Sequence, residues 1–301
     1  MSSSHAAVTA PTEHTGESFH DTRVAWDAIA PGYDRTNTPT QMWLGQECLR
    51  RAGLRPGMRF LDVAAGSGAL SIPASRLGGT VLAIDQSPRM LELLAARARS
   101  EGLAIETRVM DGHALDLEDD SFDIAGSQFG VMLFPDMPKG MREMTRVVRP
   151  GGRVLMSVYG DPHRIEFLGF LVTAIQSVRP AFTGPPMDPP PLPFQLQDPE
   201  RLRTELANAG LSEIRVETIT ETTAFQSGIA LWEWLIWSNP IVESVLDSLQ
   251  LTTGERAHIQ AALEKLVRER AGDAGAARLT NPVNIGIGTS RSFDRRRGRD
   301  C

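Results

Sequence analysis

Two hydrophobic periodicities alternate along the middle of the chain. Short runs rich in Val, Ile, Leu and Phe, typical of buried strands, are separated by longer segments in which apolar residues recur at helical spacing. The strand-like runs cover residues 58–64, 80–85, 103–110, 121–129 and 153–159. The helix-like segments cover residues 69–77, 87–102 and 137–148, and Ser87 can cap the second of them. Strands that alternate with helices over about 100 residues predict βαβ units, and therefore a parallel sheet.

Two further helices are expected after this alternating region. The pattern predicts a helix over residues 163–178 and another over 198–210, which Asp198 can cap and Gly210 can end. Residues 180–193 between them contain seven prolines. We interpret this segment as a loop; a rigid lid edge or a proline-rich ligand for a partner is the alternative.

The last part of the chain combines two strands with a long helical insertion. Alternating residues predict strands over 211–220 and 281–290. The block of about 225–280 is mostly helical in pattern, so we expect a helical cap inserted between two neighbouring strands. Residues 1–20 are polar with few apolar anchors, and residues 291–301 contain five arginines, so both ends are expected to be flexible.

Composition and charge narrow the class of protein. Hydrophobic residues make up 41% and charged residues 23% of the chain, which is ordinary for a globular domain. Cys48 and Cys301 are its only cysteines, so we expect neither a disulfide scaffold nor a metal site. The absence of an apolar run of ~20 residues or a secretion leader predicts a cytoplasmic protein without a membrane span. A net charge of −6 argues against a nucleic-acid partner.

The segment with the strongest chemical signal is residues 60–68. An apolar strand containing Asp62 turns on Gly66 and Gly68 and enters a helix. Glycines let the backbone approach a ligand closely, and a helix N-terminus offers free N–H groups. Asp85 ends the next strand, where an acid suits the two hydroxyls of a ribose. The alternatives are a plain turn at the glycines and a helix-capping role for Asp85.

Two cofactors are compatible with this strand, turn and helix. A dinucleotide fingerprint requires a third glycine, and this chain has Ser71 at that position. Asp62 also stands where a pyrophosphate group would be repelled. S-adenosylmethionine instead carries an ammonium and a sulfonium, which an acid attracts. The residues therefore favour S-adenosylmethionine, and an NAD-dependent oxidoreductase on a similar fold is the alternative.

Several spaced motifs occur in order between about residues 24 and 160. They are WDAIAPGYD (26–34), LDVAAGSG (61–68), MDGH (110–113), SFDIAGSQFGVMLFPD (121–136) and REMTRVVRPGGRVLMS (142–157). Together they resemble the class I S-adenosylmethionine-dependent methyltransferases, and most of all the ubiquinone/menaquinone-biosynthesis-like branch, which acts on small molecules. Ala65 departs from the family, which usually has Cys or Gly there.

The resemblance implies a fold and a domain organisation. The fold would be α/β: a Rossmann-like three-layer sandwich with a mostly parallel seven-stranded sheet, an antiparallel last strand and the helical cap insertion. The methyltransferase domain would cover residues 21–290, with its cofactor-binding core at about 40–160.

The resemblance also assigns residues to S-adenosyl-L-methionine and its product, S-adenosyl-L-homocysteine. Asp62 would lie near the ammonium, Asp85 would bind the ribose hydroxyls, and Asp111 would accept from the adenine amino group. Asp111 as a turn residue and Tyr33 as a packed ring are the alternatives. The complete predicted set is Tyr33, Asp62, Ala64, Gly66, Gly68, Asp85, Gln86, Asp111, Gly112, His113, Ser127 and Gln128.

Methyl transfer from a sulfonium is an in-line displacement, so it depends mainly on positioning the nucleophile and excluding water. A general base is needed only if the nucleophile keeps its proton. The catalytic candidates are His163, which follows the fifth strand, and Tyr33, which would close over the cofactor. Histidine side chains in general change charge near neutral pH, which favours His163, but a histidine that opens a helix is more often a surface or capping residue. His20 is a further candidate, from the N-terminal segment.

The acceptor is inferred by exclusion. Residues 127–130 read SQFG, where methyltransferases that act on base amines commonly have Asp/Asn-Pro-Pro-aromatic. We therefore expect a small-molecule acceptor that is aromatic, quinone-like or a secondary metabolite. Trp232, Trp234 and Trp237 could stack on such an acceptor, or they could pack the cap on the sheet. A non-catalytic protein that binds an S-adenosyl ligand is a further alternative, and a homodimer is left open.

Overall fold

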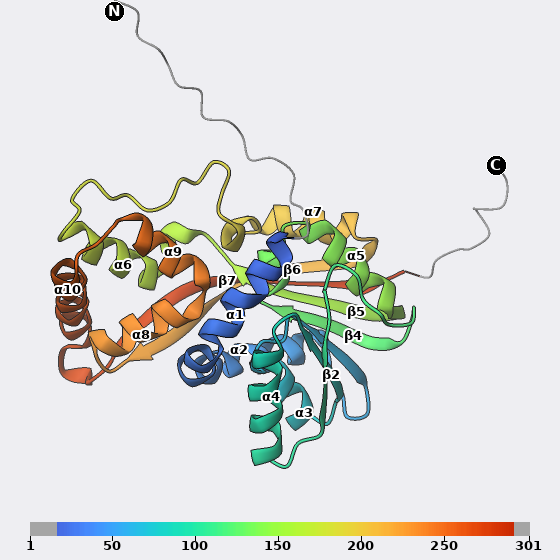
Figure 1. Cartoon of the computed structure of the whole chain (residues 1–301). Coiled ribbons are helices and arrows are strands. Elements are labelled where there is room, and N and C mark those ends of the chain that lie inside the picture. Colours follow the sequence, from blue (N-terminus) through green and yellow to red (C-terminus); the bar gives the residue numbers. More distant parts are fainter. Residues whose placement is uncertain (1–16, 292–301) are drawn as a thin grey trace, which may run out of the picture.

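A seven-stranded sheet lies at the centre of the fold (Figure 1). The computed structural model describes residues 17–291, with side chains from residue 22 onward. The strands are β1 (Arg59–Val63), β2 (Thr80–Asp85), β3 (Ile105–Val109), β4 (Phe122–Gln128), β5 (Val148–Tyr159), β6 (Leu211–Phe225) and β7 (Ala277–Ser290). Their order across the sheet is β3-β2-β1-β4-β5-β7-β6. Strands β1 to β5 pair in parallel, and β7 is antiparallel to both of its neighbours, which confirms the predicted fold class.

Helices cover both faces of this sheet and complete the three layers. They are α1 (Glu17–Thr36), α2 (Thr38–Ala52), α3 (Ser71–Arg76), α4 (Pro88–Ser100), α5 (Met137–Val147), α6 (Glu166–Gln176), α7 (Pro199–Asn208), α8 (Gly228–Ser238), α9 (Pro240–Ser248) and α10 (Thr253–Ala271). In Figure 1, α5 and α7 lie on one face of the sheet, and α2, α3 and α4 lie on the other. Helix α1 packs along α4 and α8, and so bridges the sheet domain and the cap.

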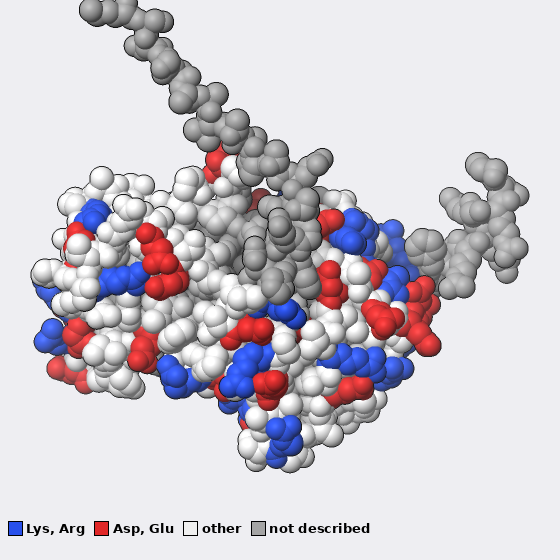
Figure 2. Space-filling view, viewed as in Figure 1, with Lys and Arg blue, Asp and Glu red and all other residues white. Residues whose placement is uncertain are grey.

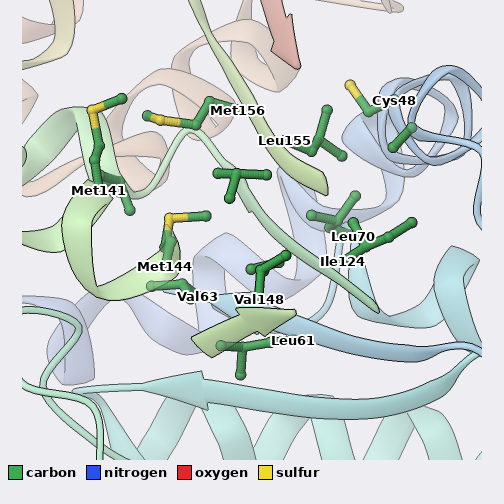
Figure 3. Packing of buried hydrophobic residues seen from close by; sticks show 14 of the residues in the cluster. Cys48, Leu61, Val63, Leu70, Ile124, Met141, Met144, Val148, Leu155 and Met156 are labelled. Atoms are coloured by element: carbon green, nitrogen blue, oxygen red, sulfur yellow. The ribbon is translucent and has the colours of Figure 1, made fainter. Parts of the chain in front are cut away.

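Buried aliphatic and methionine side chains hold these layers together. Met141 and Met144 of α5 lie with Met156 of β5 on one side of the sheet, and all three are fully buried (Figure 3). Leu155, the neighbour of Met156, lies toward Cys48 of α2 (Figure 3). Because successive side chains of a strand point to opposite faces, β5 contributes to both layers of the core.

Helices α8, α9 and α10 are inserted between β6 and β7 and form a second core with α6. Gly228 begins α8 so close to α10 that an added Cβ would lie 2.2 Å from Glu264 N, so only glycine fits there without a backbone shift. The indole N–H of Trp234 donates to Thr40 Oγ1 at 3.1 Å, and Asn37 Nδ2 donates to Trp234 O at 3.2 Å. The cap is therefore attached to the N-terminal helices as well as to the sheet.

The predicted helix-start signals are confirmed at two helices. Ser87 Oγ accepts a hydrogen bond from Met90 N at 3.1 Å at the start of α4. Asp198 Oδ1 accepts from Glu200 N at 2.9 Å at the start of α7. Both caps are local in sequence, which is why the pattern alone finds them.

Element ends differ from the prediction where a distant partner decides them. Strand β6 continues to Phe225, beyond the predicted 211–220, and β7 begins at Ala277, before the predicted 281–290. Phe225 and Ala277 are register partners, so the two strands extend together as a ribbon toward the cap. Helix α1 begins at Glu17, four residues before the predicted domain boundary.

Substitution of Trp234 tests how much the cap contributes to stability. Trp234 is 3% exposed and packs against Phe167 and Phe225, so Trp234→Ala should lower the free energy of unfolding by about 3–5 kcal/mol. Trp43 of α2 is 55% exposed, and Trp43→Ala should change the same quantity by no more than about 0.5 kcal/mol. Urea unfolding followed by circular dichroism measures both. Equal losses in the two variants would contradict the packing role of Trp234.

Candidate active site

A cleft of about 380 Å³ opens at the carboxyl edge of the sheet, where β1, β2 and β4 end. In open α/β sheets this edge is where ligands bind. Nine of the twelve predicted cofactor residues line the cleft: Tyr33, Ala64, Gly66, Asp85, Gln86, Asp111, Gly112, His113 and Gln128. The other predicted residues, Asp62, Gly68 and Ser127, do not line it.

The glycine turn after β1 brings the backbone of Gly66 to the wall of the cleft. Gly66 and Gly68 have φ angles of 52° and 102°, in the left-handed region that favours glycine. An added Cβ on Gly68 would also lie 3.0 Å from Leu94 Cγ. The turn is therefore fixed both by its backbone conformation and by close packing on α4.

Asp85 is held in this turn by backbone groups. Its Oδ2 accepts from Gly66 N at 2.9 Å, and its Oδ1 accepts from Ser87 N at 2.8 Å. The carboxyl group is 8% exposed, and burial raises its pKa to about 6 against the opposing effect of these hydrogen bonds. Ionised at neutral pH, it can accept further hydrogen bonds from hydroxyl groups in the cleft.

Asp62 lies deeper, behind the glycine turn. One of its carboxyl oxygens accepts from Ser71 Oγ at 2.5 Å, and the other has no hydrogen-bond partner within the described residues. The group is 1% exposed, and burial raises its pKa to about 7. An unpartnered buried carboxyl oxygen fits an ammonium group better than a pyrophosphate. Ser71, which the sequence marked only as a departure from the dinucleotide fingerprint, thus orients Asp62.

An aromatic wall borders the cleft beyond Asp111. The ring of His113 lies on that of Phe134, with centroids 4.4 Å apart, and His113 Nδ1 is 2.8 Å from Asp111 Oδ1. Gly112 packs under the same ring, because an added Cβ would lie 2.5 Å from Phe134 Cζ. This flat, partly apolar wall suits a purine ring. Sequence reasoning missed Phe134, since nothing local distinguishes it from a core residue.

The end of β4 is connected to the N-terminal helices through Gln41, another residue that the sequence did not single out. Tyr33 donates its hydroxyl to Gln41 Oε1 at 3.1 Å, and Gln128 Nε2 donates to Gln41 O at 3.1 Å. Burial and the nearby carboxylates hold the pKa of Tyr33 well above its usual value, so this phenol stays protonated. Ser127 has a structural contact instead: its Oγ accepts from Val131 N at 3.0 Å.

Of the histidine candidates for catalysis, His163 is not brought to the cleft. His163 is exposed in a short 3₁₀ helix (η2, Pro162–Arg164), its N–H donates to Asp161 Oδ1 at 2.9 Å, and its side chain does not line the cleft. His163 is therefore a surface residue, which is the alternative to a catalytic role that the sequence left open. The side chain of His20 lies outside the described residues. Tyr33 is the catalytic candidate that does line the cleft.

The cap tryptophans are packing residues rather than a stacking surface in the cleft. Trp232 and Trp234 are buried in the second core, and neither lines the cleft. Trp237 packs on α1, so close that an added Cβ on Gly32 would lie 2.2 Å from its ring. Burial at these positions favours the second interpretation of the sequence, in which the tryptophans attach the cap.

No group of three or more His, Cys, Asp or Glu residues that could hold a metal ion occurs in the described part of the chain.

Residues 61–156 match a family model described as a methyltransferase domain. This range begins within β1 and ends within β5, so it contains the glycine turn, Asp85 and Asp111. It covers the strands whose carboxyl ends form the cleft.

Two curated relatives extend the similarity. A demethylmenaquinone methyltransferase of Corynebacterium kroppenstedtii is 30% identical over 207 residues, which cover 65% of this chain and 87% of that protein. An uncharacterised protein of Mycobacterium tuberculosis is 38% identical over 141 residues, which cover 47% of this chain and 50% of the relative. The chain thus spans about half the length of the mycobacterial relative.

A solved structure has the same fold. Phosphoethanolamine N-methyltransferase 2 of Haemonchus contortus, in complex with S-adenosyl-L-methionine, superposes with a TM-score of 0.50 and 21% identity. The match covers 83% of this chain and 52% of that one.

Replacement of Asp85 tests the ribose assignment. Asp85→Asn removes a charged acceptor worth about 1.5–3 kcal/mol, so the Kd for S-adenosyl-L-homocysteine should rise roughly 10- to 150-fold in a calorimetric titration. Because the pKa of Asp85 is raised to about 6, wild-type affinity should fall as the pH falls through 6, and the variant should lack this dependence.

Glu92→Gln is the matched control, since Glu92 pairs with Arg89 on the surface of α4. It should bind S-adenosyl-L-homocysteine as the wild type does. An Asp85→Asn protein that is folded by circular dichroism and binds with unchanged affinity would remove Asp85 from the site.

Proposed function

The chain belongs to the class I S-adenosylmethionine-dependent methyltransferases, and from this premise we propose that it transfers a methyl group from S-adenosyl-L-methionine to a small-molecule acceptor. The observation that carries the proposal is the pair of buried acids, Asp62 and Asp85, around a glycine turn at the carboxyl edge of the sheet. No salt bridge neutralises either acid within the described residues, so the site is suited to a cationic ligand that also carries hydroxyl groups.

We assign the cofactor groups from the contacts that the side chains still offer. Asp85 would accept from the ribose hydroxyls, because it lines the cleft beside Gly66. Asp62 does not line the cleft, so it would attract the ammonium through its charge from behind the glycine turn. Asp111 and the wall formed by His113 and Phe134 would hold the adenine.

When bound, S-adenosyl-L-methionine supplies a methyl group already activated by the positive sulfur. The task left to this chain is to hold the acceptor in line and to exclude water. Tyr33, Gln41 and Gln128 form one hydrogen-bonded chain beside the cleft, which fixes the wall nearest the methionine part. Tyr33 remains protonated at neutral pH, so we assign it a positioning role rather than that of a base.

A small-molecule acceptor is supported by three observations. The cap and α1 pack together beside the cleft, which favours an enclosed acceptor over a polymer. The Corynebacterium relative is named for a quinone substrate, which suggests a quinone-like or other aromatic acceptor. On the face of the molecule in Figure 2, basic and acidic side chains are interspersed, and this argues against a nucleic-acid surface there.

None of the helices in the described residues is both long and apolar enough to cross a membrane. A cytoplasmic location, a role in secondary metabolism and a homodimer remain predictions from the sequence.

Calorimetry with two ligands tests the proposed function. The chain should bind S-adenosyl-L-homocysteine with micromolar or better affinity and should not bind NAD, because a pyrophosphate would meet the acids of the glycine turn. Mass spectrometry should then detect methylated products when S-adenosyl-L-methionine is offered with a panel of phenols, amines and thiols. Binding of NAD alone would favour the oxidoreductase alternative. Tight S-adenosyl binding with no product from any acceptor class would favour the non-catalytic one.

A further inference from the structure

Buried polar side chains extend from the cleft along one face of the sheet. Gln128 pairs with Ser157 across β4 and β5, and Glu221 pairs with Asn281 across β6 and β7. Each of the four is at most 9% exposed. Side chains alternate along a strand, and register partners share a face, so the pairing places all four on the face covered by α2. Burial of polar side chains costs free energy, so their presence on this face indicates a role other than packing.

Glu221 and Asn281 lie just past the carboxyl end of β5. Tyr159 is the last residue of β5, and its register partner on β7 is Val283. Asn281 lies two residues from Val283, which is roughly 7 Å along β7 and past the end of β5. Tyr33, which lines the cleft, lies close enough to both Asp85 and Glu221 for their charges to raise its pKa. Glu221 therefore belongs to the same edge of the sheet as the proposed cofactor site.

Several polar atoms in this group are unsatisfied. Gln128 Oε1, Ser157 Oγ and both polar atoms of the Asn281 side chain have no hydrogen-bond partner of good geometry within the described residues. The Asn281 amide still lies near enough to Glu221, and the Ser157 hydroxyl near enough to the Cys48 thiol, to influence their pKa values. A buried polar group left unpaired is costly, and such groups are rare in folded proteins. These three side chains therefore keep hydrogen-bonding capacity on one face of the sheet, which a polar ligand can use.

Glu221 is the only acid in the group, and no cation neutralises it in the described part of the chain. The titratable groups near enough to interact with it are Tyr33 of α1, Cys48 of α2 and Tyr159 of β5, none of which is cationic. Burial raises the pKa of Glu221 to about 7, although the neighbouring Asn281 amide opposes the rise. The group is thus poised to exchange a proton near neutral pH.

Aromatic rings form the apolar part of the same region. Phe129 stacks on Tyr159 with ring centroids 4.4 Å apart and an interplanar angle of 20°. Phe167 and Phe194 approach Tyr159 at centroid distances of 5.8 and 6.4 Å. Aromatic rings beside a buried acid suit a flat acceptor that carries a hydroxyl group.

Resting on the proposed function, we propose that Glu221 accepts the proton from the hydroxyl group of an aromatic acceptor that lies against Ser157 and Asn281. The acceptor oxygen forms a bond to the methyl carbon as the carbon–sulfur bond breaks, and that bond's electron pair stays on sulfur. The hydroxyl proton passes to the Glu221 carboxylate, which becomes a carboxylic acid. The products are the aryl methyl ether, S-adenosyl-L-homocysteine and protonated Glu221. An acceptor that carries a carboxylate is disfavoured, because it would meet the charge of Glu221 without a compensating cation.

The test compares three probes on protein saturated with S-adenosyl-L-homocysteine: 2-naphthol, its methyl ether and 2-naphthoate. Wild-type protein should bind 2-naphthol about tenfold or more tightly than the ether, since a hydrogen bond to a charged group is lost with the ether, and should bind 2-naphthoate most weakly. The preference for 2-naphthol should grow as the pH rises through about 7, where Glu221 ionises. Glu221→Gln should abolish both the preference and its pH dependence.

Glu217→Gln is the matched control, because Glu217 lies on the same strand, is exposed and pairs with Arg51. It should behave as the wild type does. If S-adenosyl-L-homocysteine binds but both wild type and Glu221→Gln fail to distinguish 2-naphthol from its ether, the role of Glu221 is wrong and the proposed function stands. If S-adenosyl-L-homocysteine itself does not bind, the proposed function fails and this inference with it. Thermal unfolding of each variant separates loss of the contact from loss of the fold.

Discussion

Burial of uncompensated carboxyl groups at the carboxyl edge of the sheet is the constraint on which the rest of this structure depends. Asp62, Asp85 and Glu221 are each less than 10% exposed, and burial raises the pKa of each. A buried charge is costly unless hydrogen bonds or a ligand compensate it. The glycine turn and the Ser71 hydroxyl supply part of that compensation. The remainder is available to a cationic or hydroxyl-bearing ligand, which links the stability of this edge to what it binds.

The N-terminal helices join this edge to the cap. Tyr33 and Gln41 connect the cleft to the end of β4, and Thr38 hydrogen-bonds Ser67 in the glycine turn. Asn37 reaches the backbone of Trp234 in α8. Contacts from two consecutive helices therefore fix the cofactor turn, the strand end and the cap relative to one another. Displacement of α1 or α2 would loosen all three together, so binding and cap packing are expected to be coupled.

Local signals explain what the sequence predicted and what it did not. The alternation of strands and helices, the glycine turn and the caps at Ser87 and Asp198 depend on neighbouring residues, and a pattern captures them. Gln41, Phe134 and Glu221 gain their significance from segments far along the chain, so no spacing reveals them. The case for His163 rests on the general chemistry of histidine, which says nothing about the distance of this residue from the cleft. For the tryptophans the sequence leaves both a binding surface and cap packing open, because composition does not distinguish a pocket wall from a core.

A crystal structure of the chain with S-adenosyl-L-homocysteine would test the central claim most directly, since it locates both the ribose and the sulfur. The account predicts the ribose diol on Asp85, the ammonium directed toward Asp62, and the sulfur directed toward the face that holds Ser157 and Glu221. A ligand bound in the cleft with its sulfur directed away from that face would contradict the acceptor assignment. A ligand bound elsewhere, with Asp85 free of it, would contradict the account of the site itself.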